Sequence, residues 1–157
     1  MGALRFLFSG TLHFVAVGPL VAAMGFIAYT GFNLADNAFP LFSVTLFSYL
    51  IGIPYALLYG SLCCLVLLAA TAAWPGLAHD KRPLTRCAVA IAIGFGVTCL
   101  LQGLQHVPAL LRGALTADEA WQRTDLALVF AIYLNPTLVA AGFVGWKLVP
   151  RLRQPRP

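Results

Sequence analysis

Four long apolar stretches divide this chain of 157 residues, and short polar segments separate them. The stretches run from Phe6 to Phe32, from Phe39 to Trp74, from Cys87 to Gln105 and from Leu126 to Trp146. A helix crosses a hydrocarbon core about 30 Å thick with roughly 20 residues, so each stretch can span a membrane. The pattern predicts an all-α integral membrane protein with four transmembrane helices in a bundle, over residues 6–32, 53–74, 87–105 and 126–146.

The second stretch is too long for one simple crossing, because its 36 residues would form a helix of about 54 Å. The tripeptide Gly52-Ile53-Pro54 predicts a break, since proline removes a backbone hydrogen bond and glycine weakens a helix. Residues 53–74 would then form the span, while residues 41–51 would lie at the membrane surface or re-enter it. The alternative is one long tilted helix.

The composition indicates that lipid, rather than water, surrounds this chain. Hydrophobic residues make up 61% of it and charged residues only 10%, whereas soluble domains carry about 25% charged residues. The length suits one transmembrane helical domain over residues 1–157. The formal net charge of +5 is confined to short loops and the C-terminal tail. We therefore expect the lipid bilayer as a partner and no nucleic acid.

The basic residues are distributed unevenly between the two sides that four crossings define. With the N-terminus in the cytoplasm, eight of the ten Lys and Arg residues fall inside, and only Arg112 and Arg123 fall outside. Four of the five acidic residues fall on the outer side. An excess of Lys and Arg marks the cytoplasmic side of membrane proteins with short loops. The sequence therefore predicts a multi-pass protein of the cell inner membrane with both termini cytoplasmic.

Small or polar residues recur at helical spacing in every stretch and indicate where helices meet, because they let backbones approach each other in lipid. They are Gly18 and Ala22 in the first stretch; Thr45, Ser48, Gly52, Tyr55 and Tyr59 in the second; Ala88, Ala92, Gly96, Cys99 and Gly103 in the third; and Ala127, Ala131, Asn135, Gly142 and Gly145 in the fourth. We expect these stripes to face the interior of the bundle, or in part another subunit.

Histidines and cysteines are the candidate cofactor ligands within the stretches. His13 lies about 10 Å from the inner face, whereas His106 lies near the outer surface, so the two are not expected to share a haem. The adjacent pair Cys63-Cys64 is interpreted as small apolar filler in a helix. We therefore predict no cofactor and no metal site. His13 is interpreted first as a structural residue, hydrogen-bonded within the bundle, and otherwise as a binding residue.

Three further polar residues are candidates for a binding site or a polar path through the bundle. Tyr55 and Tyr59 lie one helical turn apart, and Asn135 lies near the bilayer midplane, directly before a proline. Interrupted helices at this depth form binding sites in transporters, and prolines also serve as kinks that improve packing. The predicted kinks are Pro19, Pro54 and Pro136.

Three functional hypotheses follow, of which the sequence alone favours the first. The first is a non-enzymatic inner-membrane subunit of the accessory, assembly or immunity type, bound to other membrane proteins. The second is a small transporter or channel for a small solute or ion, which would be a homo-oligomer because four short spans seldom enclose a pore alone. A membrane enzyme or electron carrier using His13 and His106 is least favoured, since catalytic acids and bases do not cluster in the sequence.

Overall fold

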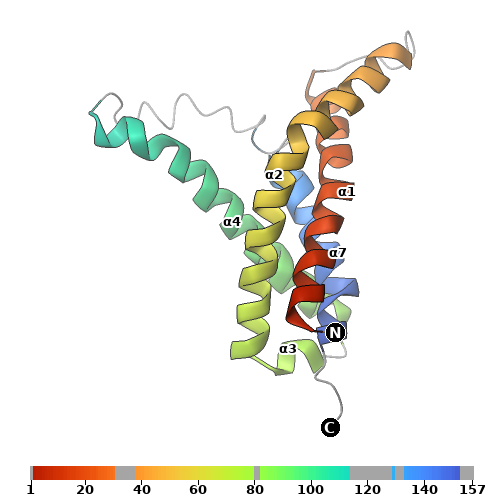
Figure 1. Cartoon of the computed structure of the whole chain (residues 1–157), viewed down its shortest axis with the longest axis vertical. Helices are drawn as coiled ribbons and strands as arrows, with labels where there is room; N and C mark the ends of the chain where they lie inside the picture. The colour runs from red at the N-terminus through yellow and green to blue at the C-terminus, as the bar shows by residue number, and fades with distance from the viewer. Residues whose placement is uncertain (1, 31–37, 80–81, 114–128, 130–132, 153–157) are drawn as a thin grey trace.

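The computed structural model describes residues 2–30, 38–79, 82–113, 129 and 133–152. Its elements are α1 (Ala3–Thr30), α2 (Ala38–Ala73), α3 (Gly76–His79), α4 (Pro83–Leu111), α7 (Asn135–Lys147) and the short 3-10 helix η2 (Val149–Leu152) (Figure 1). No strand occurs in these ranges. The predicted all-α class is therefore confirmed.

Three helices of the described chain are long and apolar enough to cross a membrane, over Ala3–Ala28, Ser43–Ala73 and Pro83–Pro108. The protein is thus membrane-embedded, as the hydrophobic pattern predicts. α7 has 13 residues, which make about 20 Å of helix. Residues 126–128 and 130–132 of the predicted fourth span lie outside the described residues.

α2 continues through the predicted break. All 36 residues from Ala38 to Ala73 form one α-helix with Pro54 inside it, so the prediction of an interruption near Gly52 and Pro54 is wrong. A proline removes one backbone hydrogen bond and crowds the carbonyl four residues earlier, and a helix can absorb both effects by bending. In Figure 1 the orange N-terminal part of α2 indeed slants away from the direction of its yellow remainder. The structure therefore agrees with the alternative prediction, in which the second stretch forms one long helix.

Glycines bring the helices together in two antiparallel pairs, α1 with α2 and α4 with α7. A Cβ atom built on Gly60 would lie 2.7 Å from the Cβ atom of Phe14 in α1. A Cβ atom on Gly145 would lie 2.7 Å from both the Cβ atom of Ala90 and the carbonyl oxygen of Arg86 in α4. Backbones approach this closely only where a side chain is missing, and such close packing is what holds helices together in lipid.

The prediction that the small residues of the third stretch face the bundle interior is wrong, while the alternative, a surface for another subunit, stays a prediction. The small residues Ala88, Ala92, Gly96, Cys99 and Gly103 are all exposed. α4 packs on α7 through its opposite face, where Arg86, Ala90, Gly94 and Thr98 are buried. Both sets of small or polar residues recur at helical spacing, and at 100° per residue they lie on opposite sides of one helix. Spacing alone therefore could not identify the buried face.

The second half of α4 leaves the other helices. Gln102 still reaches α2 through a hydrogen bond to Tyr59, but the teal C-terminal end of α4 slants away from α1, α2 and α7 (Figure 1). Large apolar side chains are exposed there, including Leu104 and Leu111. This half of α4 is thus an apolar surface that the described part of the chain does not cover.

Short elements cover the end of the molecule that lies opposite the C-terminal end of α4. The first residues of α1, the helix α3 and the end of the described chain meet there (Figure 1), and α3 contacts η2. Phe6, Leu77, Leu148 and Val149 are almost completely buried and belong to the main apolar cluster. By their positions in these elements, four basic residues gather at this end: Arg5, Arg82, Lys147 and Arg151.

Candidate functional site

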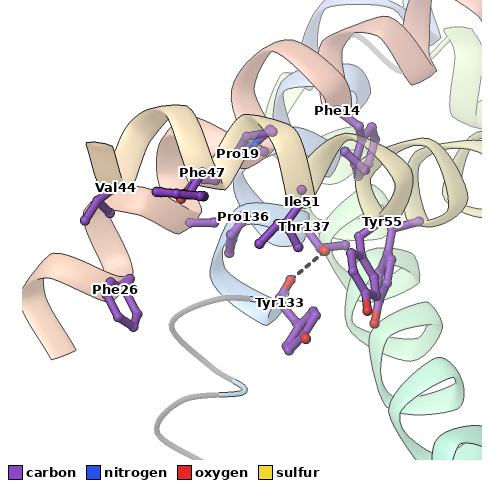
Figure 2. A pocket seen from close by; sticks show the side chains of 16 residues that line it. Phe14, Pro19, Phe26, Val44, Phe47, Ile51, Tyr55, Tyr133, Pro136 and Thr137 are labelled. Atoms are coloured by element: carbon purple, nitrogen blue, oxygen red, sulfur yellow. Dashed lines mark hydrogen bonds between the residues drawn. The ribbon is translucent and has the colours of Figure 1, made fainter. Parts of the chain in front are cut away.

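A pocket of about 380 Å³ lies between α1, α2 and the first residues of α7 (Figure 2). Small-molecule sites in proteins measure about 300–1,000 Å³, so the pocket is large enough for a ligand. None of the described residues that line it is charged. The lining residues are Phe14, Gly18, Pro19, Ala22 and Phe26 of α1; Val44, Phe47, Ser48, Ile51, Gly52, Tyr55, Ala56 and Tyr59 of α2; and Tyr133, Pro136 and Thr137.

The predicted small and polar stripes of the first two stretches form much of this wall. Gly18 and Ala22 of the first stretch, and all of the second stripe except Thr45, line the pocket. A Cβ atom on Gly52 would lie 3.4 Å from the ring of Pro19. α1 and α2 therefore touch on one side of the pocket and diverge around it. The predicted interior position holds for Gly18 and Tyr59, which are buried, whereas Tyr55 is exposed.

Three tyrosines meet at one end of the pocket. The ring centroids of Tyr55 and Tyr133 are 5.8 Å apart and meet edge to face, while those of Tyr59 and Tyr133 are 6.3 Å apart and nearly parallel. The buried hydroxyl of Tyr59 accepts a hydrogen bond of 3.0 Å from Nε2 of Gln102. The tyrosines thus form a polar patch in an otherwise apolar wall.

The rest of the pocket is apolar and extends along the helices towards Phe26 and Val44. Figure 2 shows these two residues on the side away from Tyr55 and Tyr133. Between Val44 and Tyr59 an α-helix advances about 22 Å. The pocket therefore suits an elongated apolar molecule with a polar group at one end.

The start of α7 places Tyr133 in the pocket. Tyr133 and Leu134 adopt a π-helical turn, and the α-helix then begins with Pro136 in its first turn. A proline is tolerated there because its missing N–H has no partner within the helix. The hydroxyl of Thr137 donates a hydrogen bond of 2.6 Å to the carbonyl oxygen of Tyr133, which fixes the turn (Figure 2).

The structure brings together only some of the residues that the sequence proposed. Tyr55 and Tyr59 line the pocket, as do the buried prolines Pro19 and Pro136. Asn135 is half-buried at the start of α7 and does not line the pocket. Pro54 is exposed on α2. A polar path through Tyr55, Tyr59 and Asn135 stays a prediction. Of these three residues, the two tyrosines line the pocket.

His13 lies outside the pocket, between α1 and α7. Its Nδ1 atom is 2.6 Å from the carbonyl oxygen of Ser9 one turn earlier, and its ring stacks on Phe143 with centroids 5.1 Å apart. His106 lies near the end of α4, in the half that slants away from α1 (Figure 1). The geometry around His13 is that of a residue held in a helix contact.

The adjacent cysteines are packed between helices. Cys63 and Cys64 are fully buried, and Cys64 lies directly against Gly10 of α1. Within the described residues, no three His, Cys, Asp or Glu side chains come together in a group that could hold a metal ion. The interpretation of Cys64 as filler in a helix contact agrees with this position.

Sequence reasoning missed three polar residues around the tyrosines: Gln102, Tyr133 and Thr137. Two signals were present in the sequence. Gln102 is a polar residue within an apolar stretch, and Tyr133 precedes Thr137 by four residues, which places both on one face of a helix. Neither signal shows which helices lie next to each other. The cluster could therefore be recognised only once the structure was known.

Comparisons of the chain with protein-family models, with curated proteins and with solved structures give no match.

Proposed function

We propose that this chain is a non-enzymatic multi-pass membrane protein that binds a neutral, elongated small molecule inside the bilayer. The observation that carries the proposal is the pocket, whose described lining residues are mostly apolar, include none with a charge and bring three tyrosines together at one end. Ligand sites are typically built in this way, with many apolar contacts and a few polar groups that fix orientation. A protein that carries a ligand in this pocket would be the small, homo-oligomeric transporter of the second hypothesis from the sequence.

Filling the pocket should abolish the co-purification of a small molecule. Ala22 lines the pocket, so Ala22→Phe places an aromatic ring in the space that the ligand needs. The neighbouring Leu20 is exposed and does not line it, which makes Leu20→Phe a matched control. We expect mass spectrometry after mild extraction from membranes to find about one small molecule per chain for the wild type and Leu20→Phe, and none for Ala22→Phe. An unchanged yield of bound molecule with Ala22→Phe would refute the site.

A second candidate function is that of an accessory, assembly or immunity-type subunit, bound to another membrane protein or to a second copy of the chain. The exposed small-residue face of α4, on a helix that leaves its neighbours, supports it. Such faces allow close helix contacts in lipid. The same extraction distinguishes the two functions, because a stoichiometric protein, in place of a small molecule, would favour the subunit.

For the membrane topology we propose four spans in a four-helix bundle, with both termini in the cytoplasm and the inner membrane as location. The gathering of basic residues at one end of the fold supports this orientation. Reporter fusions after Ala78 and Ala114 should then give opposite results, cytoplasmic for Ala78 and periplasmic for Ala114. The same result at both positions would contradict the proposed number of crossings.

A further inference from the structure

The three tyrosines of the pocket offer more hydrogen-bond donors than their surroundings accept. A phenol hydroxyl carries one hydrogen to donate and can also accept. Since Gln102 donates to the Tyr59 hydroxyl, that hydroxyl keeps its own hydrogen. Within the described part of the chain, the hydroxyls of Tyr55 and Tyr133 have no hydrogen-bond acceptor. The polar end of the pocket is therefore rich in donors.

These donors lie at or beside the middle of a candidate membrane span. Tyr59 lies near the middle of the candidate span Ser43–Ala73, about 24 Å and 21 Å along the helix from its two ends. Water is scarce at this depth, and an unpaired polar group there is costly. A ligand that supplies an acceptor would remove this cost, and the described lining residues offer no opposite charge for a ligand with a charged group.

Resting on the proposed function, we propose that the ligand carries an uncharged carbonyl oxygen, as in a ketone, ester or quinone, at one end of an apolar chain. The hydroxyls of Tyr55 and Tyr133 donate hydrogen bonds to this oxygen. The chain of the ligand lies along Phe47 and Ile51 towards Phe26, in the apolar part of the pocket (Figure 2). The tyrosines thereby set both the class of the ligand and its direction in the pocket.

Two probes of nearly equal size test this proposal. Tridecan-2-one carries a carbonyl near one end, and tetradecane replaces it with hydrocarbon. The full chain is placed in lipid nanodiscs at equal mole fractions of each probe in the bilayer, and occupancy is measured by native mass spectrometry. We expect the ketone to bind about tenfold more tightly than the alkane, since each of two hydrogen bonds contributes about 0.5–1.5 kcal/mol.

Replacing both donors should remove this preference. In the double variant Tyr55→Phe and Tyr133→Phe the two probes should bind equally, with ketone affinity about tenfold lower. Tyr49→Phe is the matched control, because the Tyr49 hydroxyl donates to the carbonyl oxygen of Ala16 and lies outside the pocket. It should leave the preference unchanged. The single variant Tyr55→Phe, at a residue that is 43% exposed, repeats the test with little risk to folding.

The outcomes separate the two proposals. If both probes occupy the wild-type pocket equally and the tyrosine variants change nothing, the carbonyl inference is overturned while pocket binding stands. If neither probe binds to a chain with an intact melting transition, the proposed function itself is overturned. A ketone preference that survives the double variant would also refute the role of the two hydroxyls.

Discussion

Replacing Gly145 with leucine is expected to separate α7 from α4 and to cause a large loss of stability. The new Cβ atom would lie 2.7 Å from the carbonyl oxygen of Arg86 and 2.7 Å from the Cβ atom of Ala90. The first of these atoms belongs to the backbone of α4, so the helix as a whole would have to move. Overpacking of a filled interior costs about 1–3 kcal/mol, and we expect at least the upper end of this range for leucine.

The control for this substitution lies on the same pair of helices. Gly103 has no atom within 4 Å of an added Cβ atom, so Gly103→Leu should leave the melting temperature nearly unchanged. Both variants are compared with the wild type by thermal unfolding in mild detergent. Equal melting temperatures for the two variants would contradict the close contact between α4 and α7.

Truncating Phe14 to alanine should weaken the contact between α1 and α2 by about 3 kcal/mol, the lower end of the range for buried phenylalanines. Phe14 is only 2% exposed, and its side chain lies against Gly60, where no side chain intervenes. Its ring also lines the pocket. Removal of the ring therefore leaves a gap that joins the pocket, and the two helices lose a close contact.

Phe8 provides the comparison for this truncation, since it lies on the same helix but is 73% exposed. Phe8→Ala removes the same atoms from a surface that faces lipid, and it should change the free energy of unfolding little. Chemical unfolding of both variants in the same detergent measures the difference. A loss of stability with Phe8→Ala as large as that with Phe14→Ala would show that the α1–α2 contact is not where the structure has it.

The sequence predicts the helices well because apolar length is a local property. Stretches of uncharged residues can be found without knowledge of their neighbours. The helices α1 and α2 follow two of them closely, and α4 contains a third but extends beyond both of its ends. The break at Pro54 was a wrong prediction because a proline removes only one hydrogen bond, and a helix can bend around that loss. Local chemistry therefore identifies a weak point in a helix without deciding whether the helix ends there.

The pocket could be predicted only in part. Tyr55 and Tyr59 share a helical face, and the spacing of the two residues predicted that they lie side by side. Tyr133 and Gln102 come from other helices, and their meeting with Tyr59 depends on which helices are neighbours. The buried face of α4 was missed for a related reason, since it depends on where α7 docks and not on the spacing within α4.

The lengths of α1, α2 and α4 have a consequence for the membrane around them. Their candidate spans hold 26, 31 and 26 residues, which upright would exceed a 30 Å hydrocarbon core by about 9–16 Å. Tilting or local thickening of the bilayer relieves such hydrophobic mismatch, at fractions of a kcal/mol per ångström. α4 packs on α7 through its first half, and its second half slants away from α1 and α2 (Figure 1), whereas α1 and α2 are packed against each other. The bilayer should therefore be thickest beside that pair, and the chain should favour thicker membranes over thinner ones.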